Sequence, residues 1–115
     1  MREIDLLRIK NANRVIVTAT IPYNPKKRKD NVILADVKRE CELDLLRDLI
    51  QVEQNEGNGK WMSPIDAHIN FMQDKSLLLS LGLVLDCWLR HDKWECDFHL
   101  CDCSSFHEWL VRNKV

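Results

Sequence analysis

Branched apolar residues cluster in three runs within the first third of the chain, and these runs predict extended structure. The run from Val15 to Ile21 is the richest in β-branched residues, which favour strands, and we predict a strand over 14–21. Two further runs, 4–10 and 31–37, have the same bias and predict two more strands. The asparagines at 11–13 suit the turn between the first two strands, because asparagine tolerates left-handed backbone.

Helical spacing appears next, over 38–53, where four apolar residues form one stripe: Leu45, Leu46, Leu49 and Ile50. A second helix is predicted over 63–81 from its start signal. The Ser63 hydroxyl can accept a hydrogen bond from a free backbone N–H, and Pro64 suits the first helical position. Asp66 would face the positive end of the helix dipole. Gly82 would then end this helix in a left-handed conformation.

The pattern over 83–103 predicts a β-hairpin whose turn lies at 90–93. Pairing outward from this turn gives one apolar face, with the opposed pairs Leu89–Trp94, Cys87–Cys96, Leu85–Phe98 and Leu83–Leu100. The other face has the opposed pairs Trp88–Glu95, Asp86–Asp97 and Val84–His99. A slip of one residue would mix the two sets, so the pattern specifies the register strongly.

The end of the chain predicts a short helix, because Ser105 and Glu108 have the spacing of a capping box. This helix would bury Phe106, Trp109 and Leu110. The predicted order is therefore βββ-αα-ββ-α. Strands and helices in such blocks favour an α+β fold, with a mainly antiparallel sheet of about five strands, in a single domain over 1–115.

Composition narrows the classes of protein that remain. The chain has 115 residues, 45% hydrophobic and 30% charged, with a formal net charge of -1, so only a local patch can attract a charged partner. We expect no membrane partner, because no apolar run reaches the ~20 residues of a membrane span. Acidic residues near Met1 argue against an export signal. With five cysteines, an odd number, we expect reduced thiols and a cytoplasmic location, or a nuclear one in a eukaryotic host.

The polar face of the predicted hairpin is the leading candidate for a binding surface. Its members are Trp88, Asp86, Glu95, Asp97 and His99. Carboxylates directly opposite each other are destabilising, so something offsets them: water, a basic group of a partner, or a divalent cation. We expect a protein partner that is basic at the contact, or a second copy of this chain in a homodimer, with the tryptophan as the anchor.

A basic loop provides a second candidate surface, for nucleic acid. It contains Lys26, Lys27, Arg28 and Lys29. Four adjacent positive charges can contact phosphates without reading sequence, and Tyr23 could stack on a base. The same cluster is also compatible with a solvated loop or with a short nuclear-import signal.

The cysteines allow two further interpretations, and neither leads us to expect a cofactor or a metal. Cys87 and Cys96 would face each other and could form a disulfide, but packed thiols are favoured. Zinc at Cys96, His99, Cys101 and Cys103 is the other interpretation. In a regular strand, however, His99 and Cys103 would be about 13 Å apart, and Cys96 would point to the opposite face. That site would need the strand to break near Leu100.

Catalytic motifs are missing from the sequence. It contains no G-x-S-x-G, phosphate-binding glycine loop or H-E-x-x-H pattern. Cys103 and His107 are the nearest approach to a nucleophile and its base, but Asp102 and Glu108 make their surroundings acidic. We therefore expect a small non-enzymatic binding or regulatory protein that acts through protein contact, as many inhibitors from phages and mobile elements do. Nucleic-acid binding and metal binding are the alternatives.

Overall fold

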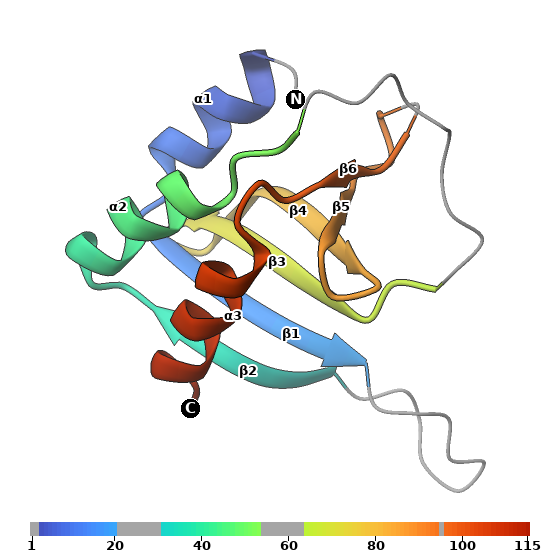
Figure 1. Cartoon of the computed structure of the whole chain (residues 1–115). Helices are drawn as coiled ribbons and strands as arrows, with labels where there is room; N and C mark the ends of the chain where they lie inside the picture. The colour runs from blue at the N-terminus through green and yellow to red at the C-terminus, as the bar shows by residue number, and fades with distance from the viewer. Residues whose placement is uncertain (1–2, 21–30, 54–63, 95) are drawn as a thin grey trace, which may run out of the picture.

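The computed structural model describes residues 3–20, 31–53, 64–94 and 96–115. Within them, six antiparallel strands form one sheet and three helices pack beside it (Figure 1). The strands lie side by side in the order β2-β1-β3-β4-β5-β6. The bounds along the chain are α1 (Glu3–Asn11), β1 (Arg14–Thr20), β2 (Asn31–Val37), α2 (Glu40–Leu49), β3 (Ala67–Gln73), β4 (Ser76–Val84), β5 (Trp88–Arg90), β6 (Phe98–His99) and α3 (Cys103–Arg112).

The predicted α+β class and the mainly antiparallel sheet are confirmed, although the order of elements differs from the prediction. The strands β1 and β2 and the helix α2 lie where their patterns placed them. Val15 and Val17 are buried at the alternation of a strand. Of the predicted helical stripe, Leu46 and Ile50 are buried, whereas Leu45 is 39% exposed and Leu43 takes its place in the core. In these segments the local pattern and the tertiary contacts favour the same structure.

The predicted strand over 4–10 is wrong, because this segment is the helix α1. Its buried residues, Asp5 and Ile9, are four positions apart and therefore share one helix face. Acidic residues occupy its first turn, and Arg8 and Lys10 occupy its last turn, an arrangement that the helix dipole favours. The aliphatic content of the segment suggested a strand, while the spacing of its buried residues is that of a helix.

The predicted helix over 63–81 is also wrong, because β3 and β4 form a hairpin there. Asp74 has φ of 54° in the tight connection, a left-handed conformation that aspartate tolerates. Burial along β3 alternates, with Ala67, Ile69 and Phe71 facing the core. Gly82 is a strand residue and not a helix stop, and an added Cβ there would lie 2.8 Å from Ile65 Cδ1.

The predicted register over 83–103 is wrong as well. β4 ends at Val84, and Leu85 and Asp86 turn the chain with φ of 51° and 65°. β5 then pairs back on β4, with Leu83 opposite Leu89. β5 and β6 are antiparallel neighbours as predicted, but Leu89 lies opposite Phe98 and not opposite Trp94. The two left-handed residues break the long strand on which the predicted register depended.

One hydrophobic core joins the sheet to all three helices. It contains Ile9 of α1, residues of α2 and α3, and alternate residues of the central strands, including Val17, Ile69 and Leu81. On the opposite face of the sheet polar side chains are hydrogen-bonded to each other, as where Ser80 Oγ donates to Asn70 Oδ1 at 2.8 Å. An antiparallel sheet tolerates such a partly wet face.

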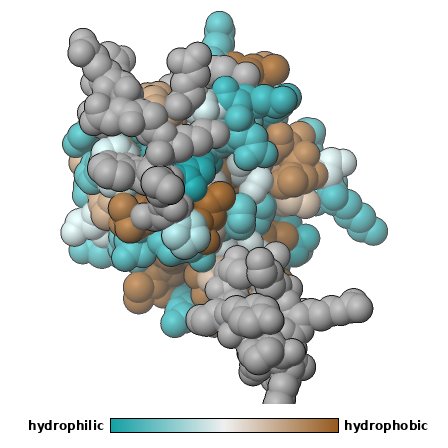
Figure 2. All heavy atoms as spheres, turned by 90° about the vertical axis from the view of Figure 1, so that its right-hand side faces the viewer, coloured by the Kyte–Doolittle hydropathy of each residue, from teal (hydrophilic) through white to brown (hydrophobic). Residues whose placement is uncertain are grey.

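The surface mixes polar and apolar groups. From the side that lies on the right of Figure 1, apolar side chains form separate groups between hydrophilic ones (Figure 2). Within the residues that the structure describes, no helix has the length and apolar character needed to cross a membrane.

Candidate functional site

The helix α3 begins at Cys103 and is capped by the residue before it. The Asp102 carboxylate accepts hydrogen bonds from the backbone N–H of Ser105 at 3.1 Å and from its hydroxyl at 2.6 Å. These two bonds lower the pKa of Asp102 below its ordinary value. The predicted capping box at Ser105 is therefore wrong by one turn, while the predicted burial of Phe106 and Trp109 is confirmed.

A disulfide joins this helix start to the turn between β4 and β5. It links Cys87 to Cys103, whose Cα atoms are 5.4 Å apart. Cys87 directly follows the two left-handed residues, so the turn brings it beside the first residue of α3. The expectation of free thiols at Cys87 and Cys103 is therefore wrong. Cys96, the predicted neighbour of Cys87, is a buried free thiol.

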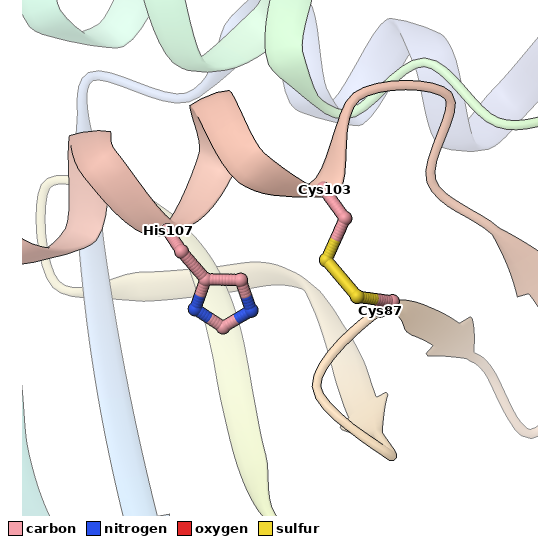
Figure 3. A group of neighbouring side chains, drawn as sticks. All are labelled: Cys87, Cys103 and His107. Carbon is pink, nitrogen blue, oxygen red and sulfur yellow. A yellow bond between two sulfur atoms is a disulfide. The ribbon is translucent and has the colours of Figure 1, made fainter.

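His107 completes a cluster around the disulfide. It follows Cys103 by four residues, so both side chains are on the same face of α3 (Figure 3). Its Nε2–H donates to the backbone oxygen of Asp86 at 2.8 Å, which fixes the ring beside the turn. The two sulfur atoms and one nitrogen of the His107 ring all lie within 4.8 Å of one another.

An open groove of about 780 Å³ runs along this cluster. The disulfide, Ser104, His107, Glu108, Val111 and Arg112 line it. Val111 is 72% exposed, so this apolar residue has little cover in the folded chain. The groove therefore combines an accessible apolar surface with sulfur and imidazole groups.

Acidic side chains predominate around the groove. Asp86 and Glu108 are exposed, and Asp102 is exposed at the start of α3. Arg112, a positive residue of the lining, donates to Glu42 Oε2 at 2.8 Å, and this bond holds the pKa of Glu42 below its ordinary value. Arg112 is thus paired with Glu42, while Asp86, Asp102 and Glu108 are exposed, so acidic side chains outnumber basic ones near the groove.

The residues predicted as a partner surface do not form a single acidic face. Trp88 and His99 are opposed across β5 and β6, with ring centroids 4.9 Å apart. The side chain of Asp97 is buried and forms an ion pair with Arg90. Asp86 is exposed and accepts the hydrogen bond from His107 through its backbone oxygen, and Glu95 lies outside the described residues.

The predicted nucleic-acid surface also lies outside the described part of the chain, namely Tyr23, Lys26, Lys27, Arg28 and Lys29. The alternative zinc set of Cys96, His99, Cys101 and Cys103 is not available in this form, since Cys103 is bonded to Cys87, while Cys101 is an exposed free thiol. Sequence reasoning did associate Cys103 with His107. It missed Cys87, because the supposed long strand placed that residue on the inner face of a hairpin.

Comparison with known proteins finds no family model that matches this chain, no curated protein that matches it and no solved structure that matches it.

Proposed function

We propose that this chain is a small binding protein that acts through contact with another protein, and that the groove along α3 is its binding surface. The observation that carries the proposal is the combination of an open groove, an apolar lining and an acidic rim. Concave surfaces with apolar lining and a few polar groups are the usual form of binding sites.

The lining supplies the contact area. The disulfide, the His107 ring and the exposed Val111 side chain offer a surface that an inserted aliphatic side chain would remove from water. Such an insertion is favourable because the buried apolar area grows without breaking a hydrogen bond of the folded chain. The groove thus favours a partner that presents a protruding apolar residue.

The rim supplies the selectivity for charge. Asp86, Asp102 and Glu108 are exposed near the groove, and Arg112 is already engaged by Glu42. A partner segment with lysine or arginine beside its apolar residue would match this potential, and matching potentials accelerate encounter and exclude acidic competitors. Such a partner is basic at the contact, as expected from the sequence. Asp86, one residue of the predicted hairpin surface, lies next to Cys87 of the groove.

A pair of synthetic peptides tests the proposal. One peptide has a central leucine flanked by lysines, and the other has glutamate at each lysine position. We expect fluorescence anisotropy to show binding of the basic peptide alone, weakening as salt rises, because salt screens exposed charges. Equal binding of the two peptides, or binding of neither, would contradict the proposal.

Matched variants locate the contact. The double variant Asp86→Asn/Glu108→Gln removes two rim charges and should weaken binding of the basic peptide about fivefold. The control Asp48→Asn/Asp92→Asn removes two exposed charges elsewhere, with the same change in net charge. Equal losses in the two variants would show that overall charge, and not the groove, attracts the peptide.

A further inference from the structure

We infer that the reduced form of this protein binds one zinc ion between Cys87, Cys103 and His107. The three side chains come from two separate segments, the turn after β4 and the first two turns of α3. Their ligand atoms already lie within 4.8 Å of one another (Figure 3). The inference does not depend on the proposed protein partner, because it concerns only groups of this chain.

The distances suit a tetrahedral ion. Zinc binds thiolate sulfur at about 2.3 Å and imidazole nitrogen at about 2.0–2.1 Å, so ligand atoms of one ion are about 3.5–3.8 Å apart. The nitrogen and the sulfurs would need only small movements to reach that spacing, and the two sulfurs would separate once their bond is broken. Because the groove is open, water can fill the fourth position.

The helix supplies two of the ligands in a suitable arrangement. Cys103 and His107 are four residues apart on α3, the spacing at which helical side chains share a face and at which zinc-binding histidines of helices occur. Cys103 is also the first residue of the helix, where the dipole favours the thiolate. His107 Nε2 now donates to Asp86, so metal binding at that nitrogen requires the ring proton to move to Nδ1.

The chemistry needs a reductant of the dithiol class. The dithiol gives two electrons and two protons to the Cys87–Cys103 bond, which becomes two thiols while the reductant becomes a cyclic disulfide. Zinc then replaces the two thiol protons, which are released to solvent, and takes the lone pair of the imidazole. The two sulfurs either bond to each other or bind the ion, so zinc and the disulfide are alternative states of one site.

Zinc titration of the two redox forms tests this inference. A background variant, Cys41→Ser/Cys101→Ser, removes the two exposed free thiols that would bind metal elsewhere. After reduction and removal of the reductant, we expect equilibrium dialysis with elemental analysis to find one zinc per chain. The oxidised form should retain almost none. Stoichiometric zinc in the oxidised form, or none in the reduced form, would overturn the inference.

A conservative variant tests the imidazole ligand. Glutamine in His107→Gln can still donate to the Asp86 oxygen, but it is a poor zinc ligand, so zinc affinity should fall about 100-fold. The matched control His91→Gln should bind zinc as the background variant does. Cobalt added to the reduced protein should give the visible bands of a four-coordinate ion with thiolate ligands, and His107→Gln should alter them. Unchanged zinc affinity and spectrum in His107→Gln would refute the site.

Discussion

Two aspartates, Asp5 and Asp97, are buried although their charge predicts exposure to water. Arg90 donates to both carboxylate oxygens of Asp97 at 2.9 Å, and 0% of the Asp97 side chain is exposed. This pairing raises the pKa of Arg90 above its ordinary value. A buried pair of this kind contributes little compared with apolar packing, but removing one partner leaves a buried charge without compensation.

Replacing Asp97 should therefore cost much more stability than replacing an exposed aspartate. We expect Asp97→Ala to lower the free energy of unfolding by about 3–5 kcal/mol, measured by urea denaturation. Asp92→Ala, at an exposed position of the same connection, should change it by less than about 0.5 kcal/mol. Similar losses in the two variants would show that the Arg90–Asp97 pair does not have the role described.

Several large core residues were predictable from sequence, although Leu45 and Leu85 were expected on apolar faces and are exposed, whereas the buried charges were not predictable. Trp94, Phe106 and Trp109 are buried as their apolar character predicts. Asp5 and Asp97 are buried because tertiary partners satisfy them: Trp94 Nε1 donates to Asp5 Oδ2 at 2.9 Å across 89 positions of sequence, and Arg90 on β5 donates to Asp97. Local periodicity contains no information about such partners, so it assigns every carboxylate to the surface.

At the scale of elements, prediction succeeded where residue type and spacing agreed. β1 is rich in β-branched residues and alternates, and α2 has a helical stripe. It failed for α1, whose aliphatic residues suggested a strand, and for β3 and β4, where a proline-containing start signal suggested a helix. That hairpin is marked by alternating burial along β3 and by the left-handed backbone of Asp74. The sequence shows the alternation of apolar residues, but it does not show the backbone conformation of Asp74.

The helix α3, which supplies most of the site, is attached by carboxylates at both ends. Asp102 caps its first turn, and Glu42 of α2 accepts hydrogen bonds from Arg112 and Asn113 near its last turn. Both carboxyl groups have a pKa below the ordinary value, Glu42 mainly because of Arg112 and Asp102 mainly because of Ser105. Their stabilising contribution is complete above their ordinary pKa values and is lost as the pH falls through the lower folded values.

Acid should therefore loosen α3, and one substitution should reduce this effect. We expect the stability of the wild-type chain to fall as the pH drops below about 4.5, while Glu42→Gln, which lacks one of the two depressed carboxyl groups, falls less steeply. Denaturation midpoints at a series of pH values would measure this difference. The control Glu40→Gln, on the same helix, should follow the wild type. Parallel curves for Glu42→Gln and the wild type would contradict the assignment.

Over the whole molecule, the Cys87–Cys103 disulfide connects the sheet to the last helix. The bond spans 16 positions of sequence and fastens the turn after β4 to the start of α3. The sequence did not predict it, because the pairing depends on a turn of two left-handed residues that no local pattern showed. The disulfide and the hydrogen bond from His107 to the Asp86 oxygen together hold the candidate site, since Cys87 and His107 come from different segments.

Reduction of the metal-free protein should lower its stability measurably. A disulfide that closes a loop of about 15 residues stabilises a folded chain by about 3 kcal/mol, and we expect a loss of that size in urea denaturation after reduction. Cys87→Ser/Cys103→Ser should show the same loss without a reductant. Cys41→Ser/Cys101→Ser should lose stability only on reduction. No difference between oxidised and reduced wild type would contradict this structural role.

Disulfide mapping tests the assembly of the site most directly. Thiols are blocked in the unfolded protein without reduction, and digestion after lysine and arginine and before aspartate places each cysteine on its own peptide. The structure predicts that mass spectrometry finds the peptide of Cys87 joined to that of Cys103, with Cys41, Cys96 and Cys101 blocked. A bond between Cys87 and Cys96 would contradict the arrangement on which the groove and the zinc site depend, and five blocked thiols would contradict the disulfide.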